Sequence, residues 1–431
     1  MHPALVAVVC AVLVATASAM SLRSLALAGD GSYYLVRILG SESIFGPDTR
    51  VLGNALRQVP VLLAARSGVT DTFVHSVLLG VGQLVLPAAI WSLAVVLSRR
   101  NEVAFTATAM TAGLCAGTTW FFSTGESAIA IPLTVLVGAL LWQPAAWTKA
   151  QACLALVASL LLVATYGSAV VTGTVLGAWA AWRAAAARSR VDRLGGAAVA
   201  VLAALSALVA AAGLIYGRES STWARSSLYF VASGEPWQFY VALVAVAAAV
   251  AALIVHGNRR LGLILLGVAG ACAALAISTL PATPVASFQA RGGATAAGLL
   301  LVFFMWALWI HDERVAPRRS SSAATGTRWL RLAPVVFVCA MGVASVHGLG
   351  AWSRSLEAFR DEVDMARSTV SVDDVLPEER RLVVWGWTSS SLSLIVRRDA
   401  TSGVLVDRDP SYVPFPPSTA REQLSDDYRW R

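Results

Sequence analysis

Long apolar runs recur along the chain, and the segments between them contain most of its charged residues. A helix that crosses a bilayer needs about 20 mostly apolar residues. Inside the bilayer each backbone polar group must find its partner within the protein, and a helix provides those partners itself. Only 13% of the residues are charged, against roughly 25% in soluble proteins. The sequence therefore predicts an α-helical polytopic membrane protein.

The apolar runs predict about eleven membrane-spanning helices. They lie near residues 4–28, 73–97, 103–122, 126–142, 151–165, 168–183, 194–216, 237–256, 261–280, 292–311 and 331–350. The boundary at Tyr166–Ser168 leaves open a single long kinked helix in place of the two spans around it. The first run also has the length of a secretory signal peptide, with ATASAM as its cleavage site. It begins without a basic residue and stays apolar to Ala28, which favours a retained helix.

Basic residues fall mainly in one set of loops between these runs. That set comprises the loops 98–102, 143–150, 184–193, 257–260 and 312–330. Loops rich in Lys and Arg stay in the cytoplasm, so the N-terminus is predicted inside and the C-terminus outside. The long outer segments are then 29–72, 217–236 and 351–431. This topology predicts a membrane domain, residues 1–350, and a small extracytoplasmic C-terminal domain, residues 351–431.

The first outer loop, residues 29–72, is predicted to be structured. Apolar residues such as Leu52 and Leu56 recur in it at helical spacing, with Arg57 among them. This pattern predicts short amphipathic helices, two in number, that lie in the outer interface. Pro60 is expected to kink or divide the helical stretch.

Asp30 follows the first apolar run almost directly and lies between Gly29 and Gly31. The tripeptide alone favours a turn, because Asp and Gly are common turn residues. The two glycines would also let the backbone turn sharply and leave room for a bulky ligand. A carboxylate at this depth is only partly solvated, so it is sensitive to its neighbours. Both a turn residue and an acid–base residue are therefore open at this position.

The tail contains the stretch RRLVVWGWTSSSLSLIVRRDATSGVLVDRDPSYVPFP. It is similar to a pattern that follows the last span in bacterial members of the GT-C superfamily of membrane glycosyltransferases. The matching positions are Trp385, Gly386, Trp387, Leu392 and Arg397 or Arg398. The whole layout resembles this family as well: a cytoplasmic N-terminus, many spans, an acid just after the first span and short helices in the first outer loop.

The resemblance implies a GT-C-like bundle that uses a polyprenyl-phosphate-linked sugar. It further implies transfer of that sugar to an envelope glycan or glycolipid acceptor. The reaction would take place on the extracytoplasmic face of the bacterial plasma membrane, in contact with membrane lipid. An inverted product is expected if one carboxylate activates the acceptor directly.

This chemistry needs a base for the acceptor and cations for the leaving phosphate. Asp30 is the candidate base, because a carboxylate within hydrogen-bond reach of a hydroxyl can take its proton. Arginine pairs bidentately with phosphate oxygens, and the predicted donor phosphate-binding residues are Arg37, Arg50, Arg57, Arg218 and Arg291. Each of these could instead be an interfacial arginine that reaches lipid phosphates. Glu126 and Glu219 are candidates for a second acid. The acidic residues of the outer loops could also hold a divalent cation. The sequence shows no dense cluster of ligands for one.

The tail beyond residue 351 is predicted to contain both helix and strand. WSRSLEAFRDEVDMARS reads as an amphipathic helix that continues the last span. A buried strand at RRLVVWGW, a helix at SSLSLIVRR and a second strand at GVLVD follow it. Ser389–Ser391 are expected to cap that helix. About 80 residues make a unit too small to be stable alone, so it is expected to pack on the outer loops.

Several other functions are weighed against this prediction. The net charge of +8 does not indicate nucleic-acid binding, because the basic residues are dispersed among loops. An inactive accessory or scaffold subunit of an envelope-glycan complex fits the same layout. A lipid-linked-saccharide transporter would need charged residues within its spans and internal repeats. The predicted spans are almost free of charged residues, and no repeat is visible. A polymerase or ligase of the O-antigen type is disfavoured by the short loop 278–291.

Overall fold

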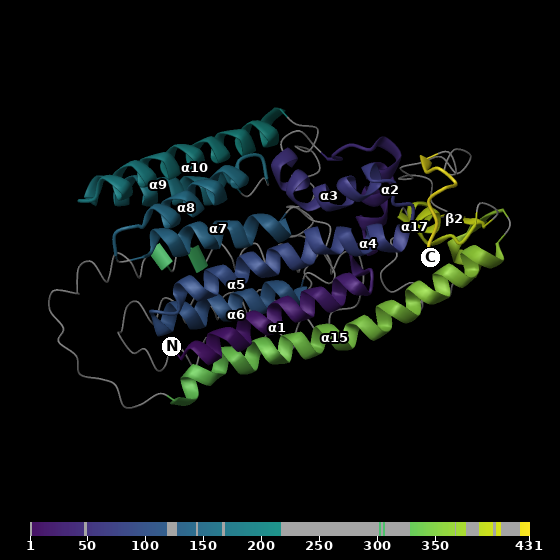
Figure 1. Ribbon diagram of the computed structural model, residues 1–431, viewed down its shortest axis with the longest axis horizontal. Helices are drawn as coiled ribbons and strands as arrows, with labels where there is room; N and C mark the ends of the chain where they lie inside the picture. The colour runs from purple at the N-terminus through teal and green to yellow at the C-terminus, as the bar shows by residue number, and fades with distance from the viewer. Residues whose placement is uncertain are drawn as a thin grey trace.

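The computed structural model describes residues 2–46, 50–118, 127–143, 145–165, 169–216, 301–302, 305–306, 328–366, 368–375, 388–399, 402–406 and 423–431. These residues form a bundle of helices, with a small two-stranded sheet at one end (Figure 1). The helices of the N-terminal half are α1 (Pro3–Leu22), α2 (Gly31–Ser41), α3 (Val51–Arg66), α4 (Thr72–Gly80), α5 (Leu86–Ser98), α6 (Glu102–Thr118), α7 (Ser127–Leu141), α8 (Lys149–Leu162), α9 (Ala169–Ala186) and α10 (Arg190–Tyr216).

Four helices of the described part are long and apolar enough to cross a membrane. They are Pro3–Leu22, Thr72–Ser98, Arg190–Gly213 and Pro334–Met365. The second joins α4 to α5 through η3 (Val81–Val85), a turn of π-helix. Shorter apolar helices at Ala104–Ala116, Ala128–Leu141 and Lys149–Leu162 coincide with three further predicted spans. The predicted spans 237–256 and 261–280, and most of 292–311, lie outside the described residues, so the count of eleven stays a prediction.

The long helix α15 (Arg328–Met365) runs along the length of the bundle and packs against α1 and α6 (Figure 1). On the opposite side of the bundle, α9 and α10 pack together closely. A Cβ atom added to Gly173 would lie 2.5 Å from the carbonyl oxygen of Ala203, so the approach of the two backbones requires glycine there. The predicted alternative of one kinked helix at 151–183 is wrong, because α8 and α9 are separate helices.

The first helix is shorter than predicted, since α1 ends at Leu22 and does not continue to Ala28. Ser24 adopts a left-handed conformation with φ 56°, which a helix cannot accommodate. The chain then forms a single 3₁₀ turn, η1 (Leu25–Leu27). Trp352 on α15 donates a hydrogen bond of 2.8 Å to the carbonyl oxygen of Arg23 and so holds the end of α1.

The first outer loop contains two helices, α2 and α3, so the predicted number is correct. The predicted helical spacing covered only the stretch that forms α3. Pro60 lies inside α3 and does not divide it. The orientation of α3 was not anticipated. Its polar residues Arg57 and Gln58 are buried, whereas the apolar Leu63 is 62% exposed. Gln58 explains part of this orientation, because its amide bonds both the N–H and the carbonyl oxygen of Phe45, at 2.8 and 2.7 Å.

The tail begins as predicted, since α15 continues past the predicted span 331–350 to Met365. Two short strands, β1 (Thr369–Ser371) and β2 (Val404–Val406), pair in parallel. The strand β2 confirms a prediction, whereas β1 was not predicted. A single turn, α16 (Val372–Val375), follows β1. The strand predicted at RRLVVWGW lies outside the described residues.

The predicted helix at SSLSLIVRR is present as α17 (Ser389–Val396). Its predicted capping is wrong. Thr388 occupies the N-cap position and makes no side-chain capping hydrogen bond, while Ser389–Ser391 form the buried first turn of the helix. A capping residue must stand before the first helical turn, and the helix begins one residue too early for these serines to do so.

Candidate functional site

The candidate site centres on the Asp30 turn, which we define as residues Arg23–Gly31 between α1 and α2. Gly29 has φ 57°, a conformation that favours glycine. Asp30 occupies the N-cap position of α2. Its side chain makes no capping hydrogen bond, so the carboxylate does not act as an ordinary helix cap. The sharp turn predicted from Gly-Asp-Gly is therefore present, and its positive φ at position 29 is what favours glycine there.

Asp30 is only partly exposed, and its Oδ1 atom is buried. The partly solvated carboxylate predicted from the sequence is thus confirmed. The N-terminus of a helix carries partial positive charge, which stabilises a nearby anion.

The Asp30 turn is held from two sides. The hydroxyl of Ser24 lies 2.6 Å from that of Ser76 on α4, and both residues are buried. Ser21, at the end of α1, donates a hydrogen bond of 2.8 Å to the carbonyl oxygen of Val77. On the other side Ser32, two residues after Asp30, donates to the carbonyl oxygen of Thr388 at 3.5 Å. The turn is therefore supported by α4 and by the residue that precedes α17.

Arg37 is the predicted phosphate contact that shares a helix with Asp30. It lies seven residues later in α2, two helical turns along the same face. Its guanidinium carbon lies 5.1 Å from the centroid of the Phe45 ring, a cation–π distance. Tyr33 and Tyr34 contact the same ring edge-on, with centroids 5.4 and 5.5 Å away. Arg37 thus belongs to an aromatic cluster and remains partly exposed.

Two further phosphate candidates lie on α3, which packs against α2. Arg50 is the N-cap residue of α3 and is partly exposed. Arg57 is only 1% exposed. Its Nε atom donates to the carbonyl oxygen of Gly53 at 3.3 Å, and its NH2 group donates to Oδ1 of Asn54 at 2.6 Å. Because Arg57 is buried in the protein, it does not lie at the surface where an interfacial arginine would reach lipid.

The other predicted residues of the site lie outside the described residues. They are Arg218, Arg291, Glu126 and Glu219. Within the described ranges, no three His, Cys, Asp or Glu side chains are grouped closely enough to hold a metal ion. The second acid and the divalent cation therefore stay predictions.

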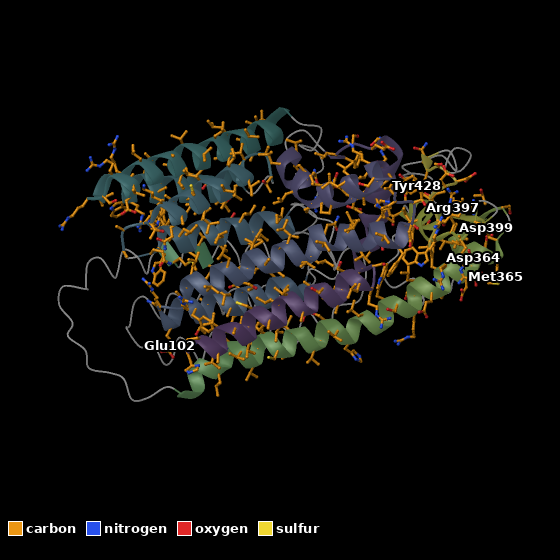
Figure 2. The ribbon with its side chains drawn as sticks, in the orientation of Figure 1. Glu102, Asp364, Met365, Arg397, Asp399 and Tyr428 are labelled. Atoms are coloured by element: carbon orange, nitrogen blue, oxygen red, sulfur yellow. The ribbon has the colours of Figure 1, made fainter. Side chains whose placement is uncertain are left out.

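The tail was expected to pack on the outer loops, and the end of the chain does contact the last residues of the first outer loop. Residues 423–431, which we call the C-terminal segment, pack against the start of α4. Figure 2 shows Tyr428 near Arg397, at the same end of the molecule as Asp364 and Asp399 and far from Glu102. Two aromatic residues, Tyr428 and Trp430, alternate with arginines in the last four positions. An alternation of this kind is the one signal that could have indicated a packed strand.

The two arginines that match the family pattern have separate roles. Arg397 is 3% exposed and pairs with Asp426 of the C-terminal segment at 3.2 Å. Arg398 is largely exposed and pairs with Asp364 at the end of α15, at 3.1 Å. Arg397 therefore joins α17 to the end of the chain, whereas Arg398 joins α17 to α15.

Comparisons with protein-family models, with curated proteins and with solved structures found no match to this chain.

Proposed function

We propose that the chain is a multi-pass membrane glycosyltransferase of the GT-C type. It would transfer a sugar from a polyprenyl-phosphate-linked donor to an envelope glycan or glycolipid acceptor, on the extracytoplasmic face of the bacterial plasma membrane. The proposal depends chiefly on Asp30, which lies in the turn between the first apolar helix, α1, and α2 and is partly buried.

Asp30 would act as general base. Its carboxylate takes the proton of the acceptor hydroxyl while that oxygen forms a bond to the anomeric carbon of the sugar. The bond between the anomeric carbon and the phosphate oxygen breaks in the same step, and the electron pair leaves with polyprenyl phosphate. The attack on the opposite face inverts the anomeric carbon.

The leaving phosphate would be stabilised by arginines of the first outer loop. Arg37 and Arg50 are both partly exposed and belong to two helices that pack together. Arg37 is oriented by Phe45, so less rotational freedom is lost when it binds an anion. Exposed apolar side chains on α3, such as Leu63, would face lipid and let the donor approach along the membrane plane.

The decisive experiment replaces Asp30 by Asn, which keeps the size of the side chain and removes its ability to take a proton. In cells that depend on this chain, Asp30→Asn should abolish consumption of lipid-linked sugar and change the composition of the envelope glycan. Glu42→Gln serves as the matched control, because Glu42 is exposed and ends α2 on the same loop. Normal transfer by a normally expressed Asp30→Asn variant would contradict the proposal.

A further inference from the structure

The C-terminal segment returns to the first outer loop and pairs with it. Arg429 forms a parallel bridge with Asp71. The N–H of Thr72 donates to the carbonyl oxygen of Arg429 at 2.9 Å, and the N–H of Arg429 donates to that of Thr70 at 3.1 Å. The N–H of Arg431 donates to Oδ1 of Asp71 at 3.3 Å. The last residues of the chain therefore form a strand-like contact with the residues that begin α4.

Aromatic packing strengthens this contact. The rings of Phe73 and Trp430 meet edge-on, with centroids 5.3 Å apart. The rings of His75 and Tyr428 are 5.8 Å apart. His75 is fully buried, and its Nε2 atom lies 2.8 Å from the carbonyl oxygen of Val69. The C-terminal segment thus covers the first turn of α4 and fixes the residues before it.

Arg397 fixes the C-terminal segment in turn. Its NH2 group donates to the carbonyl oxygens of Leu424 and Ser425, at 3.1 and 2.9 Å. Its NH1 group pairs with Asp426 at 3.2 Å. The carbonyl oxygen of Arg397 accepts a hydrogen bond of 3.0 Å from the N–H of Trp430. Only a planar group with several fixed donors can bond two successive carbonyls and a carboxylate at once.

The helix that ends at Arg397 also contacts both supports of the Asp30 turn. Near its C-terminal end, the carbonyl oxygen of Ile395 accepts a hydrogen bond of 2.6 Å from the hydroxyl of Thr72. At its N-terminal end, the carbonyl oxygen of Thr388 accepts the hydrogen bond from Ser32. One short helix therefore bridges the start of α4 and the start of α2.

A continuous set of contacts thus leads from Arg397 to Asp30. The helix α4, held at its start by the C-terminal segment, carries the Ser76 hydroxyl that bonds Ser24 in the Asp30 turn. The helix α17 reaches α2 directly through Ser32. We infer that Arg397 is a positioning residue for Asp30: through the C-terminal segment and α17 it fixes the two elements that hold the Asp30 turn. The catalytic part of this inference rests on the proposed function, whereas the mechanical part does not.

The test compares Arg397→Gln with Arg398→Gln. Both substitutions remove one positive charge from neighbouring positions, but only Arg397 bonds the C-terminal segment. Hydrogen exchange of the purified full-length protein is measured for peptides that cover residues 24–36, 70–76 and 423–431. In Arg397→Gln the amide exchange rates of all three regions should rise at least about tenfold, while those of α9 and α10 stay unchanged. Arg398→Gln should leave residues 24–36 and 70–76 at the wild-type rate.

Catalysis supplies the second readout. A displacement of about 1 Å at a catalytic group can cost about 100-fold in rate. Arg397→Gln should therefore lower kcat by about that factor and leave the KM for the lipid-linked donor near the wild-type value. Arg397→Lys, which keeps the charge but not the planar fork, should recover part of the rate. If Arg397 only stabilised the fold, Arg397→Gln would reduce the amount of folded protein. The kcat per folded molecule would then equal that of the wild type, and Arg397→Lys would have no lost rate to recover.

The outcomes separate the inference from the proposed function. Faster exchange at 423–431 without any change at 24–36 overturns the inference, even if the wild type transfers sugar. Faster exchange at 24–36 in Arg397→Gln, together with a wild type that transfers no sugar, would support the mechanical link. The same result would contradict the proposed glycosyltransferase function. Asp426→Asn tests the same link if Arg397→Gln does not fold, because Asp426 is 66% exposed. It should raise exchange at 423–431 and 24–36 by a smaller factor, and wild-type exchange at both would also overturn the inference.

Discussion

The guanidinium of Arg183 lies 3.1 Å from the carboxylate of Asp192, and more than nine-tenths of each side chain is buried. Arg183 also donates to the carbonyl oxygens of Leu141 and Gln143, at 2.8 and 2.6 Å. The same carboxylate accepts a hydrogen bond of 2.9 Å from the N–H of Trp147. This cluster therefore connects the end of α7 to α9 and α10, at the predicted cytoplasmic side.

Removing one partner of this ion pair should destabilise the protein strongly. Asp192→Asn and Arg183→Met each leave one buried charge without its counter-ion, a change that costs about 3–5 kcal/mol. Thermal unfolding in detergent measures the loss. Arg188→Gln is the control, because Arg188 is exposed in the same loop and should change stability by no more than about 0.5 kcal/mol. If Asp192→Asn lost no more stability than the Arg188→Gln control, the prediction would be contradicted.

Gly82 should not tolerate a side chain. It lies in the π-helical turn η3, and a Cβ atom there would overlap the carbonyl oxygen of Arg57 on α3. Gly82→Ala should therefore displace α3 and cost about 1–3 kcal/mol through overpacking, again read from thermal unfolding. Gly138→Ala provides the comparison, since its nearest neighbours would lie at an ordinary 3.7 Å. Equal stability of the two variants would show that α3 can move away without cost.

Two serines of α17 should respond oppositely to the same substitution. Ser393 donates to the carbonyl oxygen of Ser389 at 2.8 Å and accepts from the N–H of Leu405 at 3.0 Å. Ser393→Ala leaves that buried N–H without its acceptor, at a cost of about 1–3 kcal/mol. The buried hydroxyl of Ser391 has no hydrogen-bond partner in the described structure, so Ser391→Ala should be neutral or stabilising. Unfolding in denaturant compares them, and a larger loss for Ser391→Ala would contradict the assignment.

The contact of the C-terminal segment should weaken in alkali. Burial raises the pKa of Tyr428, and the negative charges of Glu42 and Asp427 raise it further. The folded state therefore holds the phenolic proton more tightly than the unfolded state. The corresponding stability is complete below the unfolded pKa of about 10 and is lost as the pH rises through the higher folded pKa.

Tyr428→Phe isolates this effect. The variant keeps the ring beside His75 but cannot ionise, so its stability should fall less between pH 9 and pH 11, roughly the range around the tyrosine pKa. The difference spectrum of wild type and variant near 295 nm, the absorbance of tyrosinate, should show one residue titrating above the ordinary tyrosine range. Identical pH–stability curves for the two proteins would mean that the pKa of Tyr428 is the same in the folded and unfolded states, which would contradict the prediction.

The sequence predicted most of the local structure, because helix formation in an apolar run depends on neighbouring residues alone. Apolar length indicated long apolar helices, and the described structure contains four that are long enough to cross a membrane. Helical periodicity indicated the helix α3 of the first outer loop and the extension of α15 to Met365. The sharp turn at Asp30 could also be predicted from the sequence, because glycine adopts positive φ more readily than other residues.

Periodicity could not show which face of an element would be buried. The pattern of α3 predicted an apolar face against lipid, but it could not show that Arg57 and Gln58 would be packed into the protein. For Gln58 that orientation depends on Phe45, whose backbone groups reach the Gln58 amide only once the loop has folded. The predicted capping role of Ser389–Ser391 was wrong for a related reason. Sequence patterns define the start of a helix only to within one or two residues.

The sequence by itself determined a helical chain with apolar runs long enough to cross a membrane and an acid in the turn after the first of them. The tertiary structure decided what surrounds that acid. Arg397 and Asp426 are close in the sequence, but the Asp71–Arg429 bridge joins residues at the two ends of the chain. No local preference encodes such a pairing, because two distant segments meet only after the bundle has brought their ends together. The support of the Asp30 turn is therefore a property of the folded molecule.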